Sequence, residues 1–79
     1  MVQGEGVIAA RTLGEARKAI DVLELLNWVP ASPRKLVKGV KVKPYVLLVN
    51  DFDATEPILA SIRVAAGNDD LTIARVVLL

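Results

Sequence analysis

The residues best suited to binding chemistry form a basic run in the middle of the chain. Residues 34–43 carry five lysines and arginines and no acidic residue, whereas the other 69 residues carry five basic and nine acidic residues. Positive side chains at this density can neutralise phosphates, and phosphate contacts supply most sequence-independent affinity for nucleic acid. In an extended chain, Lys41 and Lys43 project to one side about 6–7 Å apart. The predicted nucleic-acid contacts are Arg34, Lys35, Lys38, Lys41 and Lys43.

The same run has a second interpretation. A cluster of lysines can simply form a solvated face that keeps an apolar protein in solution and guards the edge of a sheet. Trp28, Tyr45 and Phe52 are the only aromatic residues, which is too few for the stacking platforms of single-strand binders. If nucleic acid binds, we therefore expect contacts mainly with phosphates.

An acidic corner at residues 50–56 is the second candidate site. Asp51, Asp53 and Glu56 follow an apolar run, and carboxylates at the end of a parallel strand lie where α/β folds bind ligands. Closely spaced carboxylates could hold Mg²⁺. The alternative, which we favour, is a turn and a helix cap, with either Asp53 or Thr55 as the cap.

Catalysis is not expected. The chain contains no histidine and no cysteine, so it lacks the usual general base, thiolate nucleophile and zinc ligands. It also lacks a glycine-rich phosphate loop. We predict a non-enzyme with no cofactor and no metal.

Composition predicts one small domain over residues 1–79. A chain of this length buries only about 60% of its unfolded surface, yet 53% of its residues are hydrophobic. We therefore expect burial to be completed in a homodimer.

No apolar run approaches the ~20 residues of a membrane span, and residues 1–5 lack the basic start of a signal peptide. A cytoplasmic protein without membrane association is predicted.

Strands and helices are predicted to alternate along the chain. Branched aliphatic runs at 6–10, 45–49 and 71–79 predict strands. Helical spacing of apolar residues predicts helices from Thr12 to about Asn27 and from about 55 to 66. Ser32-Pro33 and Gly39 are good start and stop signals for a short helix over 33–38. The expected fold is α/β, with a three-stranded, mostly parallel sheet in the order β-α-(short α)-β-α-β. We expect the strand at 71–79 to lie inside a sheet or an interface, because both its faces are apolar.

Residues 7–49 resemble part of the Alba family of archaeal chromatin and RNA-binding proteins. The resemblance rests on residues 7–11 (Val-Ile-Ala-Ala-Arg), on 18–26, and on 40–43 leading into a strand. It implies a dimeric α/β protein that binds DNA or RNA with little sequence preference, with Arg11, Lys41 and Lys43 facing the nucleic acid. A weaker resemblance of residues 45–76 to the ribosomal kink-turn-binding family implies RNA binding.

Two functions follow from these features. The first is phosphate-mediated binding of RNA or DNA through residues 34–43. The alternative is a protein-interaction or assembly module, in which the apolar C-terminal strand pairs with another sheet or packs in a dimer.

Overall fold

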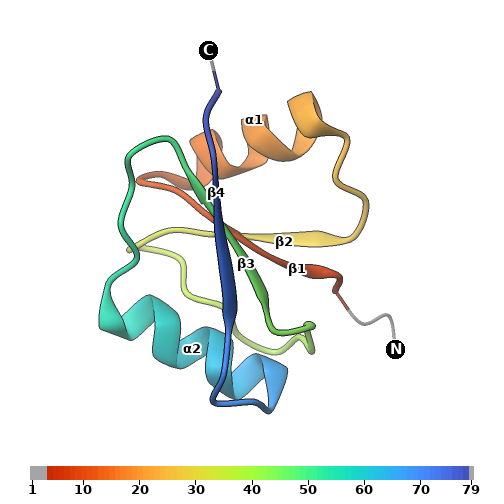
Figure 1. Cartoon of the computed structure of the whole chain (residues 1–79), viewed down its shortest axis with the longest axis vertical. Helices are drawn as coiled ribbons and strands as arrows, with labels where there is room; N and C mark the ends of the chain where they lie inside the picture. Colours follow the sequence, from red (N-terminus) through yellow and green to blue (C-terminus); the bar gives the residue numbers. More distant parts are fainter. Residues whose placement is uncertain (1–3, 79) are drawn as a thin grey trace.

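The computed structural model describes residues 4–78, which form a four-stranded, all-parallel sheet with one helix on each side (Figure 1). The spatial order of the strands is β2-β1-β3-β4. The strands are β1 (Gly6–Ala9), β2 (Trp28–Ala31), β3 (Tyr45–Val49) and β4 (Thr72–Val76). The helices are α1 (Leu13–Leu23) and α2 (Glu56–Ala66).

The strand order explains why the helices lie on opposite faces. From β1 the chain crosses to β2 at one edge of the sheet, and from β3 it crosses to β4 at the other edge. Crossovers of the same hand in opposite directions place their helices on opposite faces of a sheet. Ile8 and Val49 accordingly pack with α1, whereas Val7 and Val46 pack with α2 and the segment that precedes β3.

The predicted helix starts are largely confirmed. The Thr12 hydroxyl accepts a hydrogen bond from the Glu15 backbone N–H at 3.1 Å and caps α1. Thr55 occupies the cap position of α2, with Pro57 in the first turn, and Gly67 ends that helix in a left-handed conformation. The first helix ends at Leu23, earlier than the predicted Asn27, because Glu24 already adopts a left-handed conformation.

The prediction of three strands was wrong, because residues 28–31 form an additional strand. Pro30 indicates the end of a helix, and its missing N–H argues against a strand. The missing N–H does not matter in an edge strand when the proline nitrogen faces away from the neighbouring strand. Ala31 O accepts from the Ala10 N–H and Asn27 O accepts from the Glu5 N–H, so the alternate residue Pro30 points its nitrogen away from β1. Proline is tolerated in this position of an edge strand.

The predicted short helix over 33–38 was also wrong. Ser32 and Lys35 instead exchange two backbone hydrogen bonds of 3.0 Å in a tight turn, after which the chain is extended. A helix of one or two turns gains little because nucleation is unfavourable. The extended chain buries Val37 and Val42 in the core.

The C-terminal strand lies at a sheet edge and not in its interior. It spans Thr72–Val76, shorter than the predicted 71–79, and its first four residues are exposed. Leu79 lies outside the described residues. The predicted strand at 45–49 is confirmed, and it lies inside the sheet with β1 on one side and β4 on the other. Within residues 4–78, neither helix has the length and apolar character needed to cross a membrane.

Candidate nucleic-acid interface

The basic segment, residues 34–43, connects the carboxyl end of β2 to the start of β3 along the α2 side of the sheet (Figure 1). Two hydrogen bonds fasten it to α2. The Val37 N–H donates to the Ser61 hydroxyl at 3.4 Å, and the Val42 N–H donates to the Ala65 carbonyl at 3.3 Å. Lys41 O also accepts from the Gly4 N–H at 2.7 Å. The backbone of the segment is therefore fixed at several points.

Apolar residues within the segment turn its cations outward. Val37 and Val42 are only 5% and 1% exposed and belong to the core on the α2 side. Successive side chains of an extended chain point in opposite directions, so burial of Val42 directs its neighbours Lys41 and Lys43 away from the core. The exposed cations are Arg34, Lys35, Lys38 and Lys41.

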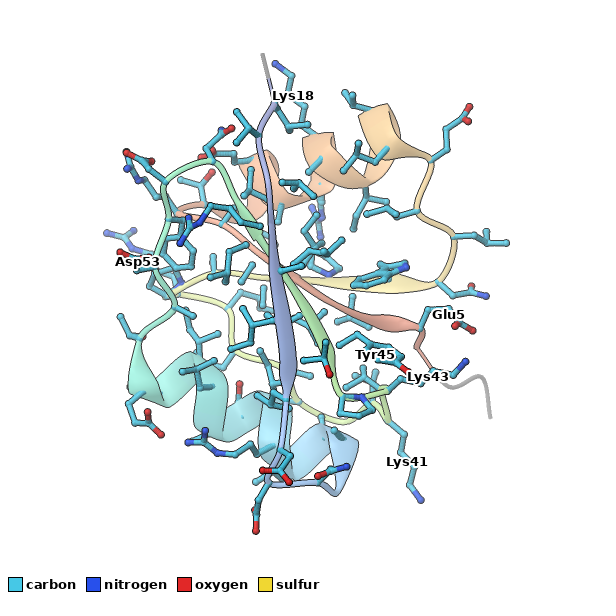
Figure 2. All side chains as sticks on the ribbon, in the orientation of Figure 1. Glu5, Lys18, Lys41, Lys43, Tyr45 and Asp53 are labelled. Carbon is cyan, nitrogen blue, oxygen red and sulfur yellow. The ribbon has the colours of Figure 1, made fainter. Side chains whose placement is uncertain are left out.

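Lys43 is the exception, because it is paired. Its ammonium lies 2.9 Å from a carboxylate oxygen of Glu5. The hydrogen bond and the negative charge of Glu5 raise the pKa of Lys43 above its usual 10.5. Figure 2 shows Lys43 directed toward Glu5, whereas Lys41 extends away from the body of the protein. Two lysines of the same segment thus differ in their availability to a ligand.

The structure divides the six predicted contact residues between the two ends of the sheet. Arg11 follows the carboxyl end of β1, where its guanidinium pairs with Asp51. The turn with Arg34 and Lys35 follows the carboxyl end of β2, next to β1. Lys41 and Lys43 instead hydrogen-bond through their backbones to Gly4, just before β1 begins. Lys38 lies between the two groups along the segment. Arg11 is therefore separated from Lys41 by the length of β1.

Outside the basic segment, arginines pair with carboxylates at several positions. Arg11 pairs with Asp51, Arg63 with Glu56, and Arg75 with Asp53. The remaining basic residues, Arg17 and Lys18 of α1, are exposed. In residues 4–78, Arg34, Lys35, Lys38 and Lys41 take part in no ion pair. Unpaired positive charge is thus concentrated on residues 34–41.

A hollow of about 570 Å³ lies between the basic segment and the last turns of α2. Lys38, Val40 and Lys41 line one side, and Val64 and Ala66 line the other. Val64 is 83% exposed and Val40 is 40% exposed. The free lysines therefore stand beside a shallow apolar surface.

The carboxylates of the acidic corner form ion pairs with arginines. Asp51, Asp53 and Glu56 each face a different arginine. The part of the chain that the structure describes contains no group of three potential ligands that could hold a metal ion. Because each carboxylate is directed toward its own cation, the three do not converge on one point.

The contacts of Arg75 could not be predicted from the sequence. Its guanidinium donates to the Asn50 and Phe52 carbonyls at 2.7 and 2.8 Å and to the Asp53 carboxylate at 2.7 Å. Asn50 adopts a left-handed backbone conformation, and its side chain donates to Glu15 and accepts from the Leu78 N–H. These bonds tie the turn after β3 to β4 and α1.

A scan against protein-family models and searches of curated proteins and of solved structures found no match to this chain. The resemblances to the Alba and kink-turn-binding families stay predictions.

Proposed function

We propose that this domain binds nucleic acid through its phosphates, using Arg34, Lys35, Lys38 and Lys41. The observation that carries the proposal is the contrast in pairing. Arg11, Lys43, Arg63 and Arg75 have carboxylate partners within the protein, whereas the four cations of 34–41 have none in residues 4–78. Unpaired cations on a fixed backbone can neutralise phosphates without first breaking an internal ion pair.

The proposed contacts are narrower than the set predicted from the sequence. Lys43 and Arg11 would have to leave Glu5 and Asp51 before binding a phosphate. We therefore propose that Lys43 and Arg11 form ion pairs within the protein and do not contact the nucleic acid. Four neutralised phosphates correspond to a slope of about −3.6 for log K against log salt on duplex DNA, and about −2.8 on a single strand.

Little sequence preference is expected. The segment contains no aromatic residue that would stack on a base. Phosphate contacts position a protein on nucleic acid and carry no sequence information directly. The proposal is a non-catalytic, cytoplasmic binding domain without a cofactor. Its ligand is RNA or DNA.

Salt-dependent binding tests this function. Fluorescent duplex RNA, duplex DNA and single strands are titrated with the full chain and followed by anisotropy. Between 50 and 200 mM salt, the duplex DNA affinity should fall about 150-fold, as a slope of about −3.6 requires. Absence of binding at 50 mM salt would refute the proposal.

Self-association is a second proposed function, favoured by an incompletely covered part of the α1 face of the sheet. Parallel sheets are ordinarily covered on both faces. On the α1 side, however, Tyr45 is 46% exposed and the neighbouring Thr72 and Ala74 are also exposed. We propose that the domain forms a homodimer.

A further inference from the structure

We propose that two copies of this chain pair through β4, antiparallel about a two-fold axis at Ala74. The inference rests on the proposed self-association and is independent of nucleic-acid binding. It specifies the strand, the register and the residues that meet.

The backbone groups on one side of β4 are free to pair. The Thr72 N–H donates to the Pro44 carbonyl and the Val76 carbonyl accepts from the Asn50 N–H, so these alternate residues face β3. The N–H and C=O of Ile73 and Arg75 must then point away from β3, because hydrogen-bonding direction alternates along a strand. In Figure 1, β4 runs across the front of the molecule, at the end of the strand order.

This edge lacks the usual protection against pairing. Natural edge strands carry lysine, proline, a bulge or a covering element. The edge of β4 has none of these within Thr72–Val76, and Ile73 is 49% exposed. Its one charged residue, Arg75, is held by Asp53 and by two carbonyl groups. The edge therefore presents free backbone groups beside largely apolar side chains.

Strand length and charge select one register for a symmetric pair. Outward-facing residues must oppose outward-facing residues, so the two-fold axis within β4 lies at Ile73, Ala74 or Arg75. An axis at Ile73 or Arg75 leaves two residues of Thr72–Val76 without an opposite residue in β4, and an axis at Arg75 also opposes like charges directly, which is destabilising. An axis at Ala74 pairs all five residues, because it pairs Ile73 with Arg75 twice and Thr72 with Val76 twice and places two alanines at the axis. We therefore assign the register centred on Ala74.

Charges beyond β4 favour the same partner. The chosen register places Asp70 of one copy opposite Leu78 of the other. Leu78 lines a hollow together with Lys18, and Figure 2 shows Lys18 at the end of the molecule where the chain leaves β4. Asp70 and Lys18 are both exposed, and neither has an ion-pair partner in the described chain. A second copy thus brings acidic side chains toward an unpaired lysine at each end of the joined strands.

A disulfide test of the register uses the full chain, which has no native cysteine. The two Ala74 residues form a pair without hydrogen bonds, with Cα atoms about 4.5 Å apart, within the range that a disulfide spans. Under mild oxidation, Ala74→Cys should give a covalent dimer roughly ten times faster than Thr72→Cys. In the assigned register, position 72 of one copy lies four residues along the strand from position 72 of the other. Equal rates would overturn the assigned register.

A proline variant tests strand pairing itself. Ile73→Pro removes an outward N–H and leaves the bonds to β3 in place, so the monomer should keep its circular dichroism spectrum. By symmetry two intermolecular hydrogen bonds are lost, and the dimer dissociation constant measured by sedimentation velocity should rise about 10- to 100-fold. Ile73→Val, which keeps the N–H, should retain the dimer. A monomeric mass for the unaltered chain at high micromolar concentration would refute the proposal.

Nucleic-acid titration separates the two proposals. Ile73→Pro should keep the salt slope per chain, and Lys38→Gln with Lys41→Gln should keep the dimer mass. Ile73→Pro should therefore lose only the dimer, and the double lysine variant should lose only nucleic-acid affinity. Each proposal can then fail without the other.

Discussion

Charged side chains are paired at the carboxyl ends of the strands, here called the carboxyl edge of the sheet, whereas most cations of the basic segment are unpaired. At the carboxyl edge, Arg11 and Arg75 each face an aspartate, and the Asn50 amide binds Glu15. In residues 34–41, four cations project from a chain whose apolar residues are anchored in the core.

The difference indicates what each region contributes. Ion pairs and carbonyl contacts at the carboxyl edge join β1, β3 and β4. The basic segment is held by Val37, Val42 and backbone hydrogen bonds, so its charge is not required for its position. Density of charge alone does not distinguish the two regions, but pairing does.

The largest expected effect concerns removal of free charge. Lys38→Gln combined with Lys41→Gln should weaken duplex DNA binding about 60-fold at 0.1 M salt and halve the slope to about −1.8, because each neutralised phosphate contributes roughly eightfold. Anisotropy titration measures both values. Arg11→Gln is the matched control and should leave the slope unchanged. An equal effect from Arg11→Gln would remove the distinction between paired and free cations.

Next in size is loss of the Arg75 contacts. Arg75→Ala should lower the free energy of unfolding by about 2 kcal/mol, because it deprives two carbonyls and a carboxylate of their donor. Urea denaturation measures the change. Lys35→Ala, an exposed cation without an ion pair, should change stability by less than about 0.5 kcal/mol. Comparable losses from both variants would contradict the separate roles of the two regions.

Lys41 and Lys43 provide a comparison within one segment. Lys41→Gln should reduce the salt slope by about 0.9, whereas Lys43→Gln should change it less, because Glu5 already neutralises Lys43. Salt titrations of both variants with the same duplex measure this difference. A larger effect at Lys43 would show that its pairing with Glu5 does not limit ligand contact.

The smallest effect is a dependence of stability on alkaline pH. The folded chain holds the Lys43 proton more tightly than the unfolded chain, because Glu5 raises its pKa. The resulting stability is fully present below pH 10.5 and is lost as the pH rises through the higher folded pKa. Thermal melts from neutral to alkaline pH should show a steeper loss for the unaltered chain than for Lys43→Gln. Identical profiles would show that the pair contributes nothing measurable.

Much of the fold could be predicted because its signals are local. The Thr12 cap, Gly67 at the end of α2 and the apolar run of β3 all follow from neighbouring residues. The strand at 28–31 could not, because tolerance of Pro30 depends on which side of the strand faces β1. The turn at 32–35 also depends on distant packing, since burial of Val37 and Val42 favours an extended chain over a short helix.

The candidate site could also be predicted only in part from the sequence. Its cations are visible in the sequence as five basic residues within 34–43, with no acidic residue among them. Their availability is not, because Glu5 lies 38 residues from Lys43, and Asp51 lies 40 residues from Arg11. Pairing between such distant residues appears only when β1 and β3 are placed side by side.

Titration of fluorescent duplex DNA across 50–200 mM salt tests the central claim most directly. Four free cations predict a slope of about −3.6 and an affinity that falls about 150-fold over that range. A slope of about −5.4, as six contacts would give, would contradict the claim that only the four cations of residues 34–41 bind phosphates. No binding at 50 mM salt would mean that residues 34–41 form only a solvated face.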